Sequence, residues 1–178
     1  MRRLSLALAV SAALVMAGPA LASGGGGMDS GAMSGGADMA AGGPSADDLV
    51  KAYNEGVVAI DAQNWKLAVS KFSFVTDNNP NVPDAWNYLG YSSRKSGNAK
   101  KSEVAYKRAL KLDPNHPRAN EYYGELLLEL NRVPEAEQRL LVLQTCCAAD
   151  PVTAELSGLI AQVKAGKPMP GAKTSAGY

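Results

Sequence analysis

Residues 86–114 read WNYLGYSSRKSGNAKKSEVAYKRALKLDP, and the spacing of small and apolar residues in this stretch recurs in the segments before and after it. The recurring positions form five series: Gly56, Gly90 and Gly124; Ala68, Ser102 and Ala136; Phe72, Tyr106 and Leu140; Val75, Ala109 and Leu143; and Pro80 with Pro114. One such motif alone would be weak evidence. Because several series keep the same register through three copies, the sequence predicts an array of repeated helical units.

Each copy is expected to form two amphipathic helices that cross where their side chains are small. In the middle copy Gly90 on the first helix would meet Ser102 on the second, so that the two backbones approach closely. Tyr106 would then fill the space toward the next unit. Glycine inside a helix costs about 1 kcal/mol relative to alanine, so its recurrence indicates a packing requirement.

Start and stop signals delimit seven predicted helices. Ser45 and Asp48 form a capping-box pattern before the first helix, and Asp150 is a suitable N-cap for the last. Proline is tolerated in the first turn of a helix, which fits the positions of Pro83, Pro117 and Pro151. The predicted helices span residues 46–62, 65–77, 83–96, 99–111, 117–130, 133–146 and 152–165.

The seventh predicted helix differs from the others because it has no partner helix after it. Its apolar residues form one stripe: Val152, Leu156, Leu159, Ile160 and Val163. Stacked repeats need their last open face covered, so this helix is expected to cap the array. Pro151 comes three residues later than the spacing of Pro80 and Pro114 predicts, so the exit from the third unit is expected to be irregular.

The middle copy resembles the tetratricopeptide repeat through Trp86-x-x-Leu89-Gly90, Ser102-x-x-x-Tyr106, Ala109-Leu110 and Pro114. The resemblance implies an all-α fold, namely an α-solenoid of three helix pairs with a C-terminal capping helix. Within a domain at residues 45–167, the units would span about 49–82, 83–116 and 117–150, and the cap 152–165. It also implies a protein that binds another protein or a peptide rather than an enzyme.

Both ends of the chain are predicted to lie outside the folded domain. Residues 1–22 combine a basic start, an apolar run and a small-x-small cleavage pattern, which is typical of a secretory signal peptide cut near Ala22. Residues 23–44 are rich in glycine, serine and methionine and predict a disordered tether, and 168–178 a flexible tail. The mature chain is therefore expected in a bacterial periplasm or outside the cell, without stable insertion in a membrane.

The first helix of each pair lines a concave groove in tetratricopeptide folds, and partners dock there. The resemblance implies that the groove residues are Tyr53, Asn87, Tyr91, Arg94, Lys95, Arg118, Glu121, Glu125 and Glu129, with Val57, Ile60 and Asp61 completing the first unit. Chaperone-binding members of the family hold a C-terminal carboxylate with lysines and asparagines at matching positions. Because the first helix offers Tyr53 and Val57 there instead, such a clamp is not expected.

Charge is distributed unevenly along the predicted groove. Residues 83–116 carry seven Lys or Arg against three acids, whereas 117–150 carry three against six. Glutamates at i, i+4 spacing repel one another, so the row of acids at 121, 125 and 129 needs an explanation. One interpretation is a receptor for a basic or polar peptide. The other is that Arg94, Lys95 and Arg118 neutralise the row across the helix interface.

Cys146 and Cys147 are the only cysteines of the chain. Adjacent Cα atoms lie about 3.8 Å apart, below the usual disulfide range, so a bridge between them would be strained. Three interpretations stay open at this point. The cysteines are small residues packed at the end of the sixth helix, or they form a strained or intermolecular bridge, which would give a homodimer, or they have a redox or metal-binding role.

The remaining candidates for a functional role give weak signals. Met28, Met33 and Met39 offer soft ligands for copper(I), and the alternative is flexible filler. His116 is the lone histidine and, without a nucleophile in view, is expected to start a helix. Removal of Arg2 and Arg3 takes the formal net charge from +1 to −1, so no nucleic-acid partner is expected. The sequence thus predicts a non-catalytic binding scaffold without a cofactor.

Overall fold

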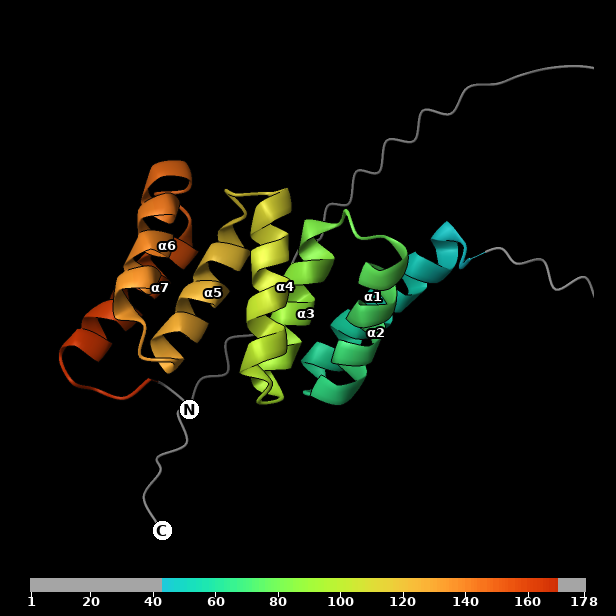
Figure 1. Ribbon diagram of the computed structural model, residues 1–178, viewed down its shortest axis with the longest axis horizontal. Coiled ribbons are helices and arrows are strands. Elements are labelled where there is room, and N and C mark those ends of the chain that lie inside the picture. Colours follow the sequence, from blue (N-terminus) through green and yellow to red (C-terminus); the bar gives the residue numbers. More distant parts are fainter. Residues whose placement is uncertain (1–42, 170–178) are drawn as a thin grey trace, which may run out of the picture. The chain divides into compact units, whose positions relative to one another are not determined.

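The computed structural model describes residues 43–169, which form seven α-helices and, within that range, no β-strand. The helices are α1 (Ala46–Asp61), α2 (Trp65–Asn78), α3 (Pro83–Lys95), α4 (Ala99–Leu112), α5 (Pro117–Glu129), α6 (Val133–Cys146) and α7 (Pro151–Lys164). Helices α1 to α6 form three pairs that follow one another in chain order along the long axis of the domain (Figure 1). The predicted all-α solenoid is confirmed, and every helix boundary lies within one residue of its predicted position.

The predicted signal peptide, nearly all of the tether and most of the tail lie outside the described residues. The first described helix, α1, begins at the predicted capping box. The backbone N–H of Asp48 donates to Ser45 Oγ at 3.2 Å, and the Ser45 N–H donates to Asp48 Oδ2 at 3.0 Å. None of the helices within residues 43–169 is long and apolar enough to cross a membrane.

The turn inside each helix pair has the same backbone conformation in all three units, although the residue type differs. Gln63, Gly97 and Asn131, which occupy equivalent positions of the three units, have φ values of 54°, 84° and 58°. In the first two turns an asparagine follows and caps the second helix: Asn64 Oδ1 accepts from the N–H of Leu67 at 3.2 Å, and Asn98 Oδ1 from that of Lys101 at 3.0 Å. The same left-handed turn therefore forms from three different residue types.

Replacement of Gln63 by glycine is expected to stabilise the domain. A left-handed conformation is unfavourable for a residue with a Cβ atom, and Gly97 occupies the equivalent position without that cost. We expect Gln63→Gly to raise the free energy of unfolding by about 0.5–1 kcal/mol, measured by urea denaturation. Gln63→Ala keeps the Cβ atom and should give no gain, so equal stabilisation by both variants would contradict this explanation.

Close packing at the helix crossings explains the repeated glycines of the first two units. A Cβ atom at Gly56 would lie 2.8 Å from the ring of Phe72, and one at Gly90 would lie 2.6 Å from the ring of Tyr106. Ser102 adds a polar contact at the second crossing, because its Oγ donates to the carbonyl oxygen of Gly90 at 2.8 Å. Each crossing is therefore closed by a fully buried aromatic ring of the same unit.

The third crossing departs from the sequence-based expectation. A Cβ atom at Gly124 would meet Leu156 of α7 at 2.7 Å, and not Leu140 of its own unit. Leu140 is only partly buried and packs at the margin of the core. Helix α7 lies against Gly124, so Leu156 closes the crossing in place of Leu140, which the repeat predicts there.

Helix α7 covers the end of the array and also keeps the register of the repeat. It buries Val152, Leu156 and Ile160 against the core formed with α5 and α6, as expected for a cap. Its first residue, Pro151, follows Pro117 at the same interval that separates Pro117 from Pro83, and Gly158 continues the glycine series. Pro151 is thus a first-turn proline in register and not a delayed closing proline. A Cβ atom at Gly158 would meet nothing within 4 Å, because no second helix crosses there.

Candidate functional site

The predicted groove residues of the second and third units lie on one surface, which we call the first-helix face. It consists of the side chains of α3 and α5 at Asn87, Tyr91, Arg94, Lys95, Arg118, Glu121, Glu125 and Glu129, joined by Glu155 of α7. Helix α5 packs against both α3 and α7, so these side chains meet across two helix interfaces. Tyr53 belongs to α1 and reaches the same region through its ring contact with Tyr88 at 5.9 Å.

Arg94 is the centre of the first ionic cluster on this face. Its side chain is 4 % exposed, and its guanidinium contacts Glu125 at 2.5 Å and Glu129 at 2.8 Å. The arginine on α3 therefore pairs with two carboxylates on α5. Its Nε atom is also buried and has no hydrogen-bond partner. A buried ion pair of this kind holds two helices in one arrangement, and loss of one partner would leave an uncompensated charge.

Arg118 contacts a second pair of carboxylates. Its Nη1 donates to Glu121 Oε2 at 2.9 Å and lies 3.6 Å from Glu155 Oε2 of α7. Burial of Glu121, whose side chain is 2 % exposed, raises its pKa to about 8, and the neighbouring carboxyl of Glu155 adds to the shift. Arg118 opposes this shift, but burial is the larger effect. Glu121 is therefore mostly protonated near neutral pH and accepts a hydrogen bond from Arg118 as a neutral acid.

The two ionic clusters decide between the interpretations of the glutamate row. Arg94 pairs with Glu125 and Glu129 across the interface of α3 and α5, as the second interpretation holds. Arg118 instead contacts Glu121 within α5 and Glu155 of α7. Lys95 does not take part in this role. Its Nζ lies over the ring of Tyr91, 5.4 Å from the centroid, and forms a cation–π contact. The net charge of the first-helix face is thus close to zero. The face is not an acidic surface that would attract a basic peptide.

Aromatic rings line the region between the ionic clusters and the first unit. Tyr91 lies 4.9 Å from Tyr122 and 6.0 Å from Trp65, measured between ring centroids. Tyr53 and Tyr88 form a second group around Phe72. Tyr88 and Tyr122 were not predicted from the sequence, although their equivalent positions in successive copies are a signal that could have revealed them. Burial raises the pKa of Tyr122 to about 12, so its hydroxyl stays protonated and available as a donor.

Asn87, like Arg94, has a buried polar atom without a hydrogen-bond partner. Its side chain is almost fully buried, at 2 % exposure, and its Oδ1 has no hydrogen-bond partner. It lies one helical turn before Tyr91 on α3 and therefore faces the same side of the helix. A buried carbonyl oxygen without a donor costs free energy, and such groups in native proteins require an explanation. A bound partner would supply this donor only if its docking moved the side chains that cover Oδ1.

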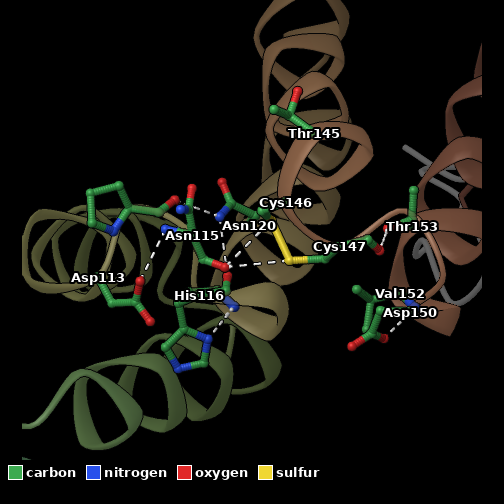
Figure 2. Close-up of a disulfide and its surroundings, with 12 residues drawn as sticks. Asp113, Asn115, His116, Asn120, Thr145, Cys146, Cys147, Asp150, Val152 and Thr153 are labelled. Carbon is green, nitrogen blue, oxygen red and sulfur yellow. Dashed lines mark hydrogen bonds between the residues drawn. A yellow bond between two sulfur atoms is a disulfide. The ribbon is translucent and has the colours of Figure 1, made fainter.

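The structure joins Cys146 and Cys147 in a disulfide between neighbours, as Figure 2 shows. Of the three interpretations, the structure has the bridge within one chain, and Cys146, in the last turn of α6, is exposed and not packed in the core. Neither cysteine is free to link two copies of the chain or to ligate a metal as a thiolate.

Met28, Met33 and Met39 lie outside the described residues.

Other candidate features are His116 and a cavity beside α1 and α2. His116 caps α5 as expected, since its Nδ1 accepts from the N–H of Ala119 at 3.3 Å, while its Nε2 lies 3.1 Å from Asp84 Oδ1. A cavity of about 760 Å³ lies on the open side of α1 and α2, where Val50, Val58 and Leu67 are exposed. From residue 43 to residue 169, no three His, Cys, Asp or Glu side chains gather in a way that could hold a metal ion.

Comparison with solved structures places this arrangement among known folds. The TPR2B domain of yeast Sti1 in complex with pHsp70 is 15% identical over 68% of this chain and 100% of that chain, with a TM-score of 0.64. The Yersinia enterocolitica type III secretion chaperone SycD, in complex with a peptide of the translocator YopD, is 21% identical over 68% and 93%, with a TM-score of 0.60. PcrH in complex with the chaperone binding region of PopD is 23% identical over 71% and 98%, with a TM-score of 0.63.

Sequence comparison gives a consistent result. No curated protein matches the chain. Two family models, both described as a tetratricopeptide repeat, match residues 53–106 and 93–163. Together these matches run from Tyr53 to Val163 and include all seven helices at least in part. With the periodic sequence and the stacked helix pairs, they show that the chain belongs to the tetratricopeptide repeat family.

Proposed function

We propose that this chain is a non-catalytic scaffold that binds a segment of another protein, or a peptide, on its first-helix face. The observation that carries the proposal is the buried, unpaired carbonyl oxygen of Asn87, on the same side of α3 as Tyr91. The amide can accept a backbone N–H of the bound segment, and the tyrosine ring offers apolar area with little conformational entropy to lose. The solved structures of SycD with a YopD peptide and of PcrH with the chaperone binding region of PopD support a bound protein segment as the ligand.

The chemistry of the face suggests what kind of segment it accepts. Three cations, Arg94, Lys95 and Arg118, lie beside the glutamates of this face, so little net charge is left to attract a strongly charged ligand. Half-buried tyrosine rings suit apolar side chains, and the Asn87 amide suits a backbone group in an extended segment. The proposed partner is therefore a largely uncharged segment with apolar side chains. The internal disulfide leaves no thiol for a covalent link between copies of the chain.

The proposal is tested by binding peptides from a random-sequence display library to the full chain and measuring their affinity for two leucine variants. Asn87→Leu removes the amide but keeps a side chain of similar size, and it is expected to weaken binding at least tenfold. Loss of an unpaired buried polar atom should leave stability unchanged or raise it. Reduced affinity would therefore reflect the binding site and not unfolding.

Asn54→Leu is the matched control for this experiment. Asn54 is exposed on α1 and lines the 760 Å³ cavity, away from the first-helix face. The proposal predicts that Asn54→Leu binds the selected peptides as the original chain does. Weaker binding by Asn54→Leu together with full binding by Asn87→Leu would move the site to the α1–α2 cavity and overturn the proposal.

We further propose that the scaffold acts in a bacterial periplasm after removal of residues 1–22. The support is the order of basic start, apolar run and small-x-small pattern before residue 23. Determination of the N-terminal residue of the protein isolated from its own cells tests this directly. An N-terminus near Ser23 is the expected result, and a chain that keeps Arg2 and Arg3 in the cytoplasmic fraction would contradict export.

A further inference from the structure

The disulfide lies at the junction where the third helix pair passes into α7. Cys146 is the last residue of α6, and Cys147 is its C-cap. The Cys147 N–H donates to the carbonyl oxygen of Leu143 at 2.8 Å, which ties it to α6. The Cys147 carbonyl oxygen accepts from Thr153 Oγ1 at 2.8 Å and from the N–H of Asp150 at 2.9 Å, which ties it to the start of α7 (Figure 2). Cys147 thus links the end of α6 to the start of α7.

Both sulfur atoms face a single acceptor on a different element. Sγ of Cys146 lies 3.6 Å, and Sγ of Cys147 lies 3.7 Å, from the carbonyl oxygen of Asn115 in the turn between α4 and α5 (Figure 2). A disulfide sulfur carries no proton and cannot donate to this oxygen. A thiol at either position could donate. The surroundings therefore contain an acceptor that only the reduced pair can use.

We propose that Cys146–Cys147 is a redox-active site that reacts with a dithiol and that its oxidation state sets how firmly α7 is held. A thiolate of the dithiol attacks Sγ of Cys146, which is an exposed residue, and the bond between the two cysteine sulfurs breaks. The electron pair goes to Cys147 Sγ, which takes up a proton. The second thiol of the reagent then attacks the mixed disulfide and releases Cys146 as a thiol. The reagent leaves as a disulfide, and two electrons and two protons remain on the cysteine pair.

The position of the pair favours two stable states over continuous turnover. The sulfurs lie at the C-terminus of α6, where the helix dipole disfavours negative charge and therefore disfavours a thiolate. The reduced pair should stay protonated, with a thiol hydrogen bond to the Asn115 carbonyl. A protonated thiol is a poor nucleophile, so reoxidation should be slow. These properties fit a switch and do not fit a catalytic dithiol.

Reduction should loosen α7 because the disulfide restricts the backbone at the junction. The bridge closes a small ring through the Cys146–Cys147 peptide, and this ring limits the dihedral angles between α6 and the Thr153 contact. The cap itself is held by few residues, chiefly Val152, Leu156 and Ile160. Local opening of such a terminal element needs less free energy than global unfolding. The reduced chain is thus expected to open α7 more often while α1 to α4 stay unchanged.

Hydrogen-exchange mass spectrometry of the full chain with and without dithiothreitol tests the proposal. Alkylation under denaturing conditions should find no free thiol before treatment and two afterwards. Amides of α7 should then exchange several-fold faster in the reduced chain, while those of α1 and α2 keep their rates. The variant Cys146→Ser, Cys147→Ser should show fast α7 exchange with or without dithiothreitol.

Three results would overturn the inference. Two free thiols in the chain prepared under air would show that the bridge does not form. Unchanged α7 exchange after complete reduction would show that the bridge does not control the cap. Equal acceleration in α1 and α7 would show that reduction destabilises the whole domain and not the junction. None of these results depends on peptide binding, so the proposed function is tested separately.

Discussion

Replacement of Gly90 by alanine should destabilise the domain, although alanine is the better helix former. The added Cβ atom would lie 2.6 Å from the Cδ1 and Cε1 atoms of Tyr106. That ring is completely buried and packs against Tyr123 of the next unit, so it cannot move aside. Overpacking of this kind costs about 1–3 kcal/mol, and the helix propensity of alanine returns about 1 kcal/mol. We expect a net loss of up to about 2 kcal/mol in the free energy of unfolding, measured by urea denaturation.

Gly158→Ala is the matched control, because the same substitution occurs at the equivalent position of α7. Nothing lies within 4 Å of a Cβ atom there, and the residue is exposed. Alanine should therefore stabilise the domain by about 0.5–1 kcal/mol through helix propensity alone. Opposite signs for the two variants are the expected result. A stabilising Gly90→Ala would show that the crossing does not require glycine and that the recurrence of this residue has another cause.

Stability should fall as the pH rises from 5 to 8, and Glu121 is the group responsible. Burial raises the folded-state pKa of this acid to about 8, whereas an exposed glutamate ionises near pH 4.5. Between these values the folded chain holds a proton that the unfolded chain has released, so the free energy of unfolding decreases with increasing pH. The limiting slope is about 1.4 kcal/mol per pH unit, and we expect a total loss of about 2–4 kcal/mol by pH 8.

Glu121→Gln separates this effect from the titration of other groups. Glutamine has the shape of the protonated acid and can still accept the hydrogen bond from Arg118 Nη1. The variant should match the original chain near pH 5, exceed its stability at pH 8, and show a flatter profile by urea denaturation at each pH. A parallel profile for both proteins would mean that Glu121 is ionised in the folded state and that Arg118 outweighs burial.

The fold could be predicted from the sequence because its signals are local and periodic. The constant interval between the repeated glycines and the caps at Ser45 and Asp150 placed every helix end within one residue. The left-handed turns were hidden because Gln63, Gly97 and Asn131 share a conformation but not a residue type. The expected irregular exit from the third unit was wrong, because Pro151 is equivalent to the first-turn Pro117 and not to the closing Pro114.

The candidate site was only partly predictable, since its properties depend on contacts between helices. The sequence placed Asn87, Arg94 and Glu121 on one face, but side-chain spacing does not reveal burial. Arg94 could have pointed to solvent, and only the packing of α3 on α5 brings it to Glu125 and Glu129. The unpaired oxygen of Asn87 is likewise a property of the packed structure and has no signature in the sequence.

The most direct test of the proposed function is an NMR titration of the isotope-labelled chain with a library-selected peptide. We predict saturable shift changes at Asn87, Tyr91 and Tyr122, on the first-helix face. Lys100 and Lys107 on the outer helix α4 should keep their shifts, and so should Asn54 beside the α1–α2 cavity. Saturable changes confined to α4 or to the cavity, with the first-helix face unaffected, would contradict the proposed function.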